Sequence, residues 1–243
     1  MNPNVWSTRR PGYGGAYGGV SQAQIDEGLR AYMLRIYNYM ASGLALTGIV
    51  AYVAAFSGFY ASIAATPLIW LVMLAPLGFV LALSFGINRM SAGTAQAVFW
   101  AYAAVMGLSL AGIFLIYTGA SIARVFFITG GTFAAMSLYG YTTKRDLSQF
   151  GSFLMMGLIG IIIASLVNMF IGSTALQFAI SVIGVLVFVG LTAWDTQSIK
   201  EMYVASDDGQ LAGKKSIMGA LRLYLDFLNL FLMLLQLFGN RRD

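Results

Sequence analysis

The 243-residue sequence contains neither cysteine nor histidine, and only 9% of its residues are charged. The lack of cysteine excludes disulfides, thiolate metal sites and cysteine nucleophiles. The lack of histidine removes the commonest general base, the commonest metal ligand and the usual side chain that titrates near neutral pH. Zinc hydrolases, Ser-His-Asp enzymes and haem proteins with histidine ligands are therefore excluded, and we predict that the protein is not an enzyme and has no cofactor.

Hydrophobic residues make up 59% of the chain, against about 45–50% in soluble domains. So few charged side chains cannot cover the surface of a soluble protein of this size. The formal charge is +5, but the basic residues are scattered singly between apolar runs, so nucleic acid is not a predicted partner. The composition predicts a polytopic membrane protein whose main partner is the lipid bilayer.

Seven apolar segments approach the roughly 20 residues that a helix needs to cross about 30 Å of hydrocarbon. Short connections between them favour antiparallel neighbours. The fold class predicted is therefore all-α, a bundle of seven transmembrane helices in one domain, 31–243. The predicted spans are 36–57, 68–87, 96–117, 121–141, 152–171, 175–195 and 216–238.

Residues 1–30 differ from the rest of the chain. The stretch RRPGYGGAYGG (9–19) is rich in glycine and tyrosine without apolar periodicity, which predicts a disordered tail. With the N-terminus inside, eleven of the fourteen lysines and arginines fall on the cytoplasmic side. Because basic residues favour that side, we predict a cytoplasmic N-terminus and an outer C-terminus. A re-entrant last segment would instead bring Arg241 and Arg242 inside.

Two of the nine acidic residues lie in apolar segments. Asp195 ends the run GVLVFVGLTAWD, and Asp226 interrupts LRLYLDFLNLFLMLLQLFG. A carboxylate in a span is costly and usually faces the bundle interior, where it has a function. The two residues are nearly equidistant from Gln210 in the intervening polar stretch, so an antiparallel hairpin would bring them to the same depth. Two such carboxylates would share a proton, because both cannot ionise cheaply.

Other polar residues allow two interpretations each. As the alternative to a carboxylate pair, Asp195 is an ordinary helix-end residue at the membrane interface, and Asp226 pairs with Arg222, four residues earlier. Arg89 follows the second span and either stabilises the ionised pair or lies among lipid headgroups. Asn168 and Asn229 either form interhelical hydrogen bonds or line a path through the bundle.

Four stretches together resemble the Bax inhibitor-1 family, also called the transmembrane Bax inhibitor motif family, and its bacterial branch above all. The resemblance covers roughly residues 25 to 240. It implies a seven-helix bundle with a central last helix, and a pH-dependent calcium leak gated by two aspartates and a nearby arginine. Asp195, Asp226 and Arg89 fall on those positions. The stretches are LSFGINRMS (83–91), SLYGYTTKRDLS (137–148), GLTAWDTQSIKEMY (190–203) and LYLDFLNLFLMLLQLFG (223–239).

The leading hypothesis is a pH-sensitive, calcium-permeable leak channel of the bacterial inner membrane, gated by the Asp195–Asp226 pair. Calcium is the transported ion, and the two carboxylates would bind it weakly and transiently because a hard cation needs more oxygen ligands than they supply. The resemblance also permits a second function, a non-transporting regulatory subunit that binds a membrane protease or another membrane protein. An intramembrane aspartyl protease is disfavoured because neither aspartate follows a Gly-x-Gly element, and a coupled transporter because no internal repeat is evident.

Overall fold

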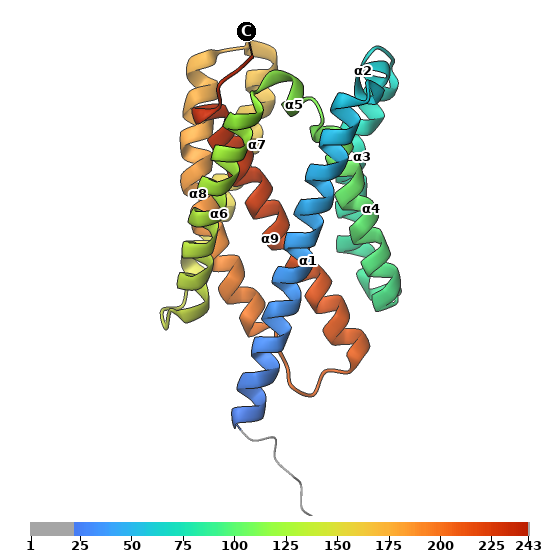
Figure 1. Cartoon of the computed structure of the whole chain (residues 1–243). Helices are drawn as coiled ribbons and strands as arrows, with labels where there is room; N and C mark the ends of the chain where they lie inside the picture. Colours follow the sequence, from blue (N-terminus) through green and yellow to red (C-terminus); the bar gives the residue numbers. More distant parts are fainter. Residues whose placement is uncertain (1–21, 243) are drawn as a thin grey trace, which may run out of the picture.

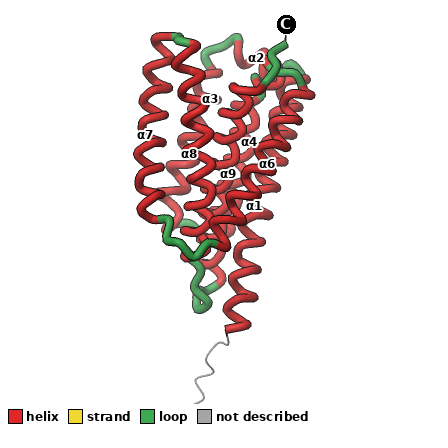
Figure 2. Tube along the Cα trace, turned by 90° about the vertical axis from the view of Figure 1, so that its left-hand side faces the viewer, coloured by secondary structure: helices red, strands yellow, loops and turns green. Residues whose placement is uncertain are grey.

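Seven long helices run between the two ends of the bundle in the computed structural model, which describes residues 22–242 (Figure 1). Each is long and apolar enough to cross a membrane, so the predicted all-α polytopic fold is confirmed. Figure 2 shows that most of the connecting loops lie at the two ends. The long helices are α1 (Gln22–Phe56), α3 (Leu68–Gly86), α4 (Ala92–Leu110), α6 (Gly119–Thr142), α7 (Ser148–Ile171), α8 (Thr174–Glu201) and α9 (Gly209–Phe238).

Three short helices complete the described part: α2 (Phe59–Ala64), η1 (Ile87–Arg89) and α5 (Ile113–Ile116). The first long helix begins earlier than the sequence predicts. Residues 22–30, which were assigned to the tail, form the first turns of α1. The first of these turns, residues 22–27, extend beyond the other helices (Figure 1), so they need no apolar stripe and give no periodic signal. The rest of the predicted tail, residues 1–21, lies outside the described residues.

Side-chain caps fix where several helices begin. Ser91, Thr118, Ser173 and Asp208 each accept a hydrogen bond from the backbone N–H three residues later, at the start of α4, α6, α8 and α9 respectively. These bonds satisfy backbone donors that have no partner inside the helix. Local sequence therefore sets the boundaries that divide the apolar chain into separate spans.

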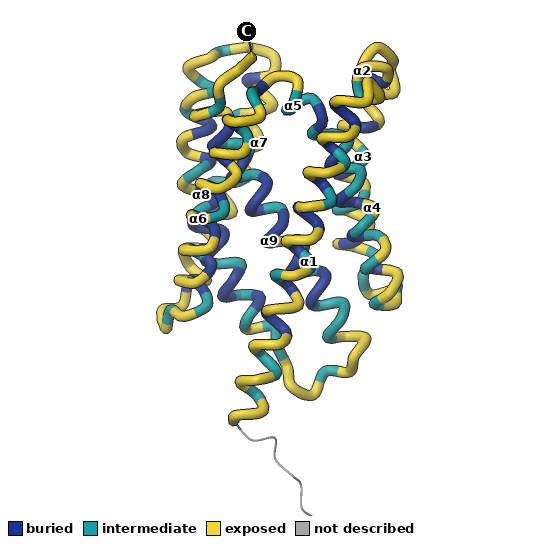
Figure 3. Tube along the Cα trace, in the orientation of Figure 1, coloured by how far each residue is buried: buried dark blue, intermediate teal, exposed yellow. Residues whose placement is uncertain are grey.

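The last helix lies at the centre of the bundle, as the family resemblance implies. In its most apolar window 67% of the residues are buried, against 17% in α3 and in α7. Figure 3 shows α9 as a largely buried strip that crosses behind α1. It packs against α8, α1, α6 and α4. Because lipid replaces water around a bundle, the exposed apolar faces of α3 and α7 are normal lipid-facing surfaces.

Pro76 interrupts the backbone hydrogen bonds of α3, but the carbonyl that it leaves free still accepts a hydrogen bond. Proline has no N–H, so it cannot bond to the carbonyl of Val72, four residues earlier. The hydroxyl of Ser109 in α4 donates to that carbonyl at 2.5 Å. A neighbouring helix thus satisfies the freed group, which is how prolines are tolerated inside membrane spans.

The C-terminal residues are attached to the start of α6. The N–H of Thr118 donates to the carbonyl of Asn240 at 3.0 Å, and the N–H of Asn240 donates to Ser121 Oγ at 2.8 Å. The N–H of Arg242 also donates to the carbonyl of Ile116 at 2.8 Å. This end of the bundle lies opposite the end where α1 begins (Figure 1). The last helix therefore crosses the whole bundle and is not re-entrant.

Candidate functional site

The structure brings Asp195 and Asp226 together between α8 and α9. Their carboxyl groups lie within hydrogen-bonding reach of each other. The side chain of Asp195 is 13% exposed, and Asp226 is 5% exposed. Two carboxyl groups at this separation and burial cannot both carry a charge without a large electrostatic cost. A proton held between them removes that cost.

The two aspartates meet by a route that differs from a symmetric hairpin. Helix α8 ends at Glu201, only six residues after Asp195, whereas α9 begins at Gly209, seventeen residues before Asp226. The contact forms because α9 runs obliquely across the bundle and reaches α8 part-way along its length (Figure 1). The predicted proximity is therefore realised through the tilt of α9 rather than through equal distances from the turn.

Arg222 is the cation that accompanies the pair. Its Nη1 atom lies 3.9 Å from Asp195 Oδ1, and its side chain is 43% exposed. It precedes Asp226 by one helical turn of α9, so the two side chains share one face of the helix. The sequence predicts Arg222 only as an alternative partner of Asp226, and its spacing of four residues from Asp226 is the signal that places it at the site.

A cavity of about 920 Å³ opens beside the pair. Residues of α3, α4, α7, α8 and α9 line it, and most of them are apolar. Its polar lining includes both aspartates, Arg222, Asn229 and Tyr102. Among residues 22–242, three buried side-chain oxygens have no hydrogen-bond partner: Asp226 Oδ2, the Tyr102 hydroxyl and the Tyr32 hydroxyl, of which the first two line this cavity. Buried polar atoms of this kind usually bind water or a ligand, and the cavity has room for either.

The other predicted site residues lie at different depths. Asn229 lines the cavity, and its Nδ2 donates to the carbonyl of Leu225 at 2.8 Å. Asn168 lies at the far end of α7, where its Nδ2 donates to Gln177 Oε1 at 3.0 Å and its Oδ1 accepts from the N–H of Ser173. Asn229 therefore has the position predicted for a path-lining residue, whereas Asn168 stabilises the turn between α7 and α8.

Arg89 does not contact the pair in this structure. It is exposed in η1, and the neighbouring carbonyl of Asn88 accepts a hydrogen bond from Lys214 Nζ at 3.4 Å. Lys214 precedes Asp226 by twelve residues of α9, which is about 18 Å along a helix axis. Arg89 thus lies near the start of α9, and the pair lies in its middle.

A tightly held metal ion is not supported by the donor set. Residues 22–242 contain no group of three or more acidic side chains that could hold a metal ion. The site offers two carboxylates and the amide of Asn229, whereas Ca²⁺ takes 6–8 oxygen ligands. Such a set is suited to weak coordination of a cation that keeps much of its hydration.

A seven-helix membrane bundle, in which Asp226 of the central helix meets Asp195 of the neighbouring helix α8, defines the structural class of the protein. The family model described as "Inhibitor of apoptosis-promoting Bax1" matches residues 29–243. The chain therefore belongs to the Bax inhibitor-1 family, and the resemblance seen in the sequence is confirmed.

Bacterial relatives match most of the chain. It is 52% identical to the inner membrane protein YbhL of Escherichia coli over 226 residues, which cover 91% of this chain and 97% of YbhL. It is 54% identical to a protein of Rickettsia prowazekii over 219 residues, 90% and 93% of the two chains. A membrane protein of Streptococcus pyogenes is 35% identical, with 91% and 97% covered.

Proposed function

We propose that the protein is a pH-sensitive leak channel for cations, permeable to calcium and gated by the Asp195–Asp226 pair. One observation carries the proposal: the carboxyl groups of Asp195, which is 13% exposed, and Asp226, which is buried, face each other on two neighbouring helices and line one cavity. In a chain that contains no histidine, such a pair is the side-chain group best suited to respond to protons near neutral pH.

The proton on the pair is the proposed gate. When the two carboxyl groups share a proton, they hold α8 and α9 together at this depth. When the proton leaves, two negative charges face each other in a poorly solvated place, and their repulsion favours separation of the helices. Arg222 or an entering cation then compensates the charge. The predicted role of Arg89 requires η1 to move toward the pair in the conducting state.

The cation would be a transported ion rather than a resident cofactor. Asp195, Asp226 and Asn229 supply oxygen ligands on one wall of the cavity, and water or backbone carbonyls would supply the rest. Weak binding is what conduction requires, because an ion that is held tightly does not leave. The arrangement therefore favours passage of calcium over storage.

The proposed location is the bacterial inner membrane, with the N-terminus in the cytoplasm. Two observations support it. The related protein YbhL is an inner membrane protein, and most basic residues cluster toward the end of the bundle where α1 begins. Asp195 and Asp226 would then respond to the proton concentration of whichever side the 920 Å³ cavity is open to.

Calcium flux into liposomes tests the proposal. The purified chain is reconstituted with a calcium dye inside the vesicles, and flux is recorded from acidic to alkaline pH. We expect flux that rises as the pair loses its proton. Asp195→Asn and Asp226→Asn each leave a neutral amide beside one carboxyl group, so no pair of charges can form and the pH dependence should disappear.

Glu201→Gln is the matched control, because it also neutralises a carboxylate of α8, but an exposed one. It should leave the pH profile unchanged. Absence of flux at every pH, in protein that melts like the native chain, would overturn the channel and favour the second function, a regulatory subunit that binds a membrane protease or another membrane protein. Flux that persists with an unchanged profile in both aspartate variants would overturn the gate.

A further inference from the structure

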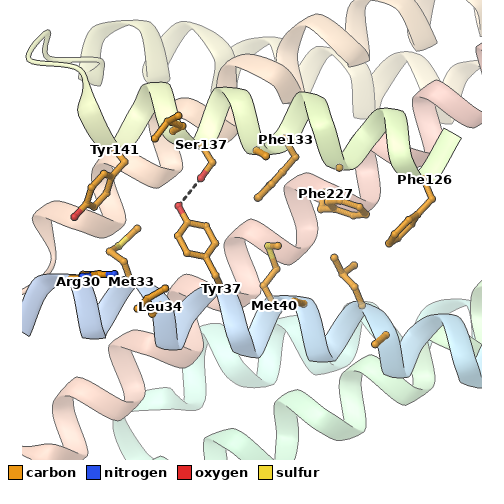
Figure 4. Close-up of a pocket in the computed structure, with 16 residues that line it drawn as sticks. Arg30, Met33, Leu34, Tyr37, Met40, Phe126, Phe133, Ser137, Tyr141 and Phe227 are labelled. Atoms are coloured by element: carbon orange, nitrogen blue, oxygen red, sulfur yellow. Dashed lines mark hydrogen bonds between the residues drawn. The ribbon is translucent and has the colours of Figure 1, made fainter. Parts of the chain in front are cut away.

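A second concavity lies between α1 and α6, with α9 as its floor. Its volume is about 720 Å³, within the range of small-molecule sites. We call it the α1–α6 groove. Figure 4 shows side chains of α1 and α6 that point toward each other across it, including Met40, Phe133 and Phe126. Apart from Arg30, Tyr37, Ser137 and Tyr141, its lining is apolar.

The groove continues along the whole height of the bundle. A further cavity of about 280 Å³ shares Leu44, Phe126 and Phe227 with it. Along α1 the joined lining extends from Arg30 to Ala51, about 32 Å at 1.5 Å per residue. That length matches the roughly 30 Å of hydrocarbon in a bilayer. A chain lying in the groove would therefore run parallel to the acyl chains of the membrane.

The end of the groove at the start of α1 is basic. Arg30 lines it opposite Tyr141 (Figure 4). Lys200 Nζ lies 5.2 Å from the centre of the Tyr141 ring and donates to the Tyr141 carbonyl at 2.8 Å. The acidic residues Asp26 and Glu27 lie about one turn closer to the N-terminus and do not line the groove. The apolar groove thus ends at one lining cation, Arg30, and a second cation, Lys200, is bonded to the neighbouring Tyr141.

The groove is too narrow for a helix but wide enough for an acyl chain. The hydroxyls of Tyr37 and Ser137 are 2.6 Å apart, so these two side chains connect α1 and α6 across the groove (Figure 4). A transmembrane helix is about 10–12 Å wide with its side chains and cannot enter between helices that are joined in this way. An acyl chain can, and the hydrogen bond leaves no unsatisfied hydroxyl against it.

We propose that the α1–α6 groove binds one anionic glycerophospholipid. An acyl chain lies along Phe133, Phe227 and Met40, and the phosphate lies at Arg30 and Lys200. Basic side chains at a helix end attract anionic headgroups, and the apolar lining removes the chain from the bulk lipid. The site is on the side of α9 opposite the aspartate cavity, and the proposal is independent of ion conduction.

The test compares two adjacent glycines of α6. Gly130 lines the groove, whereas Gly131 does not, and a Cβ at either position meets nothing within 4 Å. Gly130→Leu should fill the groove, and Gly131→Leu should add the same side chain outside it. The full-length protein in detergent is mixed with equal amounts of phosphatidylglycerol and phosphatidylcholine, and native mass spectrometry counts the lipids retained.

We expect the native chain and Gly131→Leu to retain one phosphatidylglycerol, and Gly130→Leu to retain it at least tenfold less. Ala134→Phe, on the same wall of the groove, is the second blocking variant if Gly130→Leu does not fold. Equal retention by the Gly130 and Gly131 variants would overturn the site. A dimer that Gly130→Leu converts into a monomer, with unchanged lipid retention, would show instead that a second copy covers this face.

Two arginines of α1 test the headgroup. Arg30→Gln should lower the preference for phosphatidylglycerol over phosphatidylcholine at least threefold. Arg35→Gln changes an exposed arginine of the same helix that does not line the groove, and it should leave the preference unchanged. Equal preferences in the native chain and in Arg30→Gln would contradict an anionic headgroup at this end.

Discussion

Asp226 and Phe227 are neighbours in α9, but they face different cavities. Asp226 lines the cavity that contains Asp195, Arg222 and Asn229, whereas Phe227 lines the α1–α6 groove. Successive residues of a helix point about 100° apart, so one residue of sequence separates a charged wall from an apolar one. The comparison teaches that a central helix can carry two chemically different sites when both of its faces are covered by other helices.

We call the face of α9 that lines the α1–α6 groove its apolar side, and the face that lines the aspartate cavity its polar side. The apolar side should contribute more to the free energy of unfolding than the polar side. Phe227 is buried, and its ring centroid lies 5.3 Å from that of Phe126 and 5.6 Å from that of Phe133. Phe227→Ala should lower the free energy of unfolding by about 3–5 kcal/mol because it opens a void that this packing cannot fill. Unfolding of the detergent-solubilised protein by SDS measures the change.

The same substitution on a lipid-facing side chain is its control. Phe170 in α7 is 84% exposed, so Phe170→Ala should change the free energy of unfolding by less than about 0.5 kcal/mol. Phe227→Ala should also retain the pH profile of calcium flux, because the aspartates on the other face are unchanged. A profile that moves with Phe227→Ala would break the separation between the two sides of α9.

On the polar side of α9, a hydroxyl of α4 stabilises the helix α3, which lines the aspartate cavity. Pro76 lines the aspartate cavity, and Ser109 donates to the carbonyl of Val72 that this proline leaves free. Ser109→Ala should cost about 1–3 kcal/mol of unfolding free energy, since the carbonyl of Val72 loses this hydroxyl donor. In a Pro76→Ala background the restored N–H can bond to that carbonyl, so Ser109→Ala should cost less.

A double-mutant cycle measures this difference directly. Ser152→Ala is the control, because that hydroxyl donates to the carbonyl of Ser148 within its own helix and is exposed. It should change the unfolding free energy by less than about 0.5 kcal/mol. Equal costs of Ser109→Ala with and without Pro76 would mean that the hydroxyl does not compensate for the proline.

Much of this arrangement can be predicted from the sequence, and the remainder depends on how the helices are tilted. Apolar length identifies all seven spans, because each must cover the same hydrocarbon thickness. The spacing of Asp195 and Asp226 predicts their contact. It does not predict which arginine joins them, because Arg89 and Arg222 are both predicted on the cytoplasmic side of the membrane. Only the oblique path of α9 places the two arginines at different depths in the bundle.

Two further differences have local causes. The first turns of α1, residues 22–27, are polar and extend past the bundle, where no hydrophobic pattern is required, so the start of this helix leaves no periodic signal. Asn168 lies in an apolar run like Asn229, but it is close to the end of α7, where it bonds to the turn. Depth within a span, rather than polarity, separates the cavity-lining asparagine from the structural one.

Replacing Arg222, the cation beside the aspartate pair, tests how charge near the pair sets the pH dependence of flux. A positive charge near the pair favours its deprotonated form, so Arg222→Gln should move the midpoint of calcium flux to higher pH. The side chain of Arg222 is 43% exposed and its Nη1 lies 3.9 Å from Asp195. Exposed ion pairs contribute at most about 1 kcal/mol, which limits the shift to roughly 0.7 pH unit.

Arg89→Gln is measured beside it, because Arg89 is the arginine that the family resemblance assigns to the pair. If gating involves only the contacts of this structure, Arg222→Gln moves the midpoint and Arg89→Gln does not. A shift in Arg89→Gln alone would mean that η1 approaches the pair when the channel conducts, and that Arg222 contributes only to the resting state. Either result assigns the compensating charge to one arginine, because Arg89 lies near Lys214, about 18 Å from Asp226 along the axis of α9, too far to act on the pair together with Arg222 without a rearrangement.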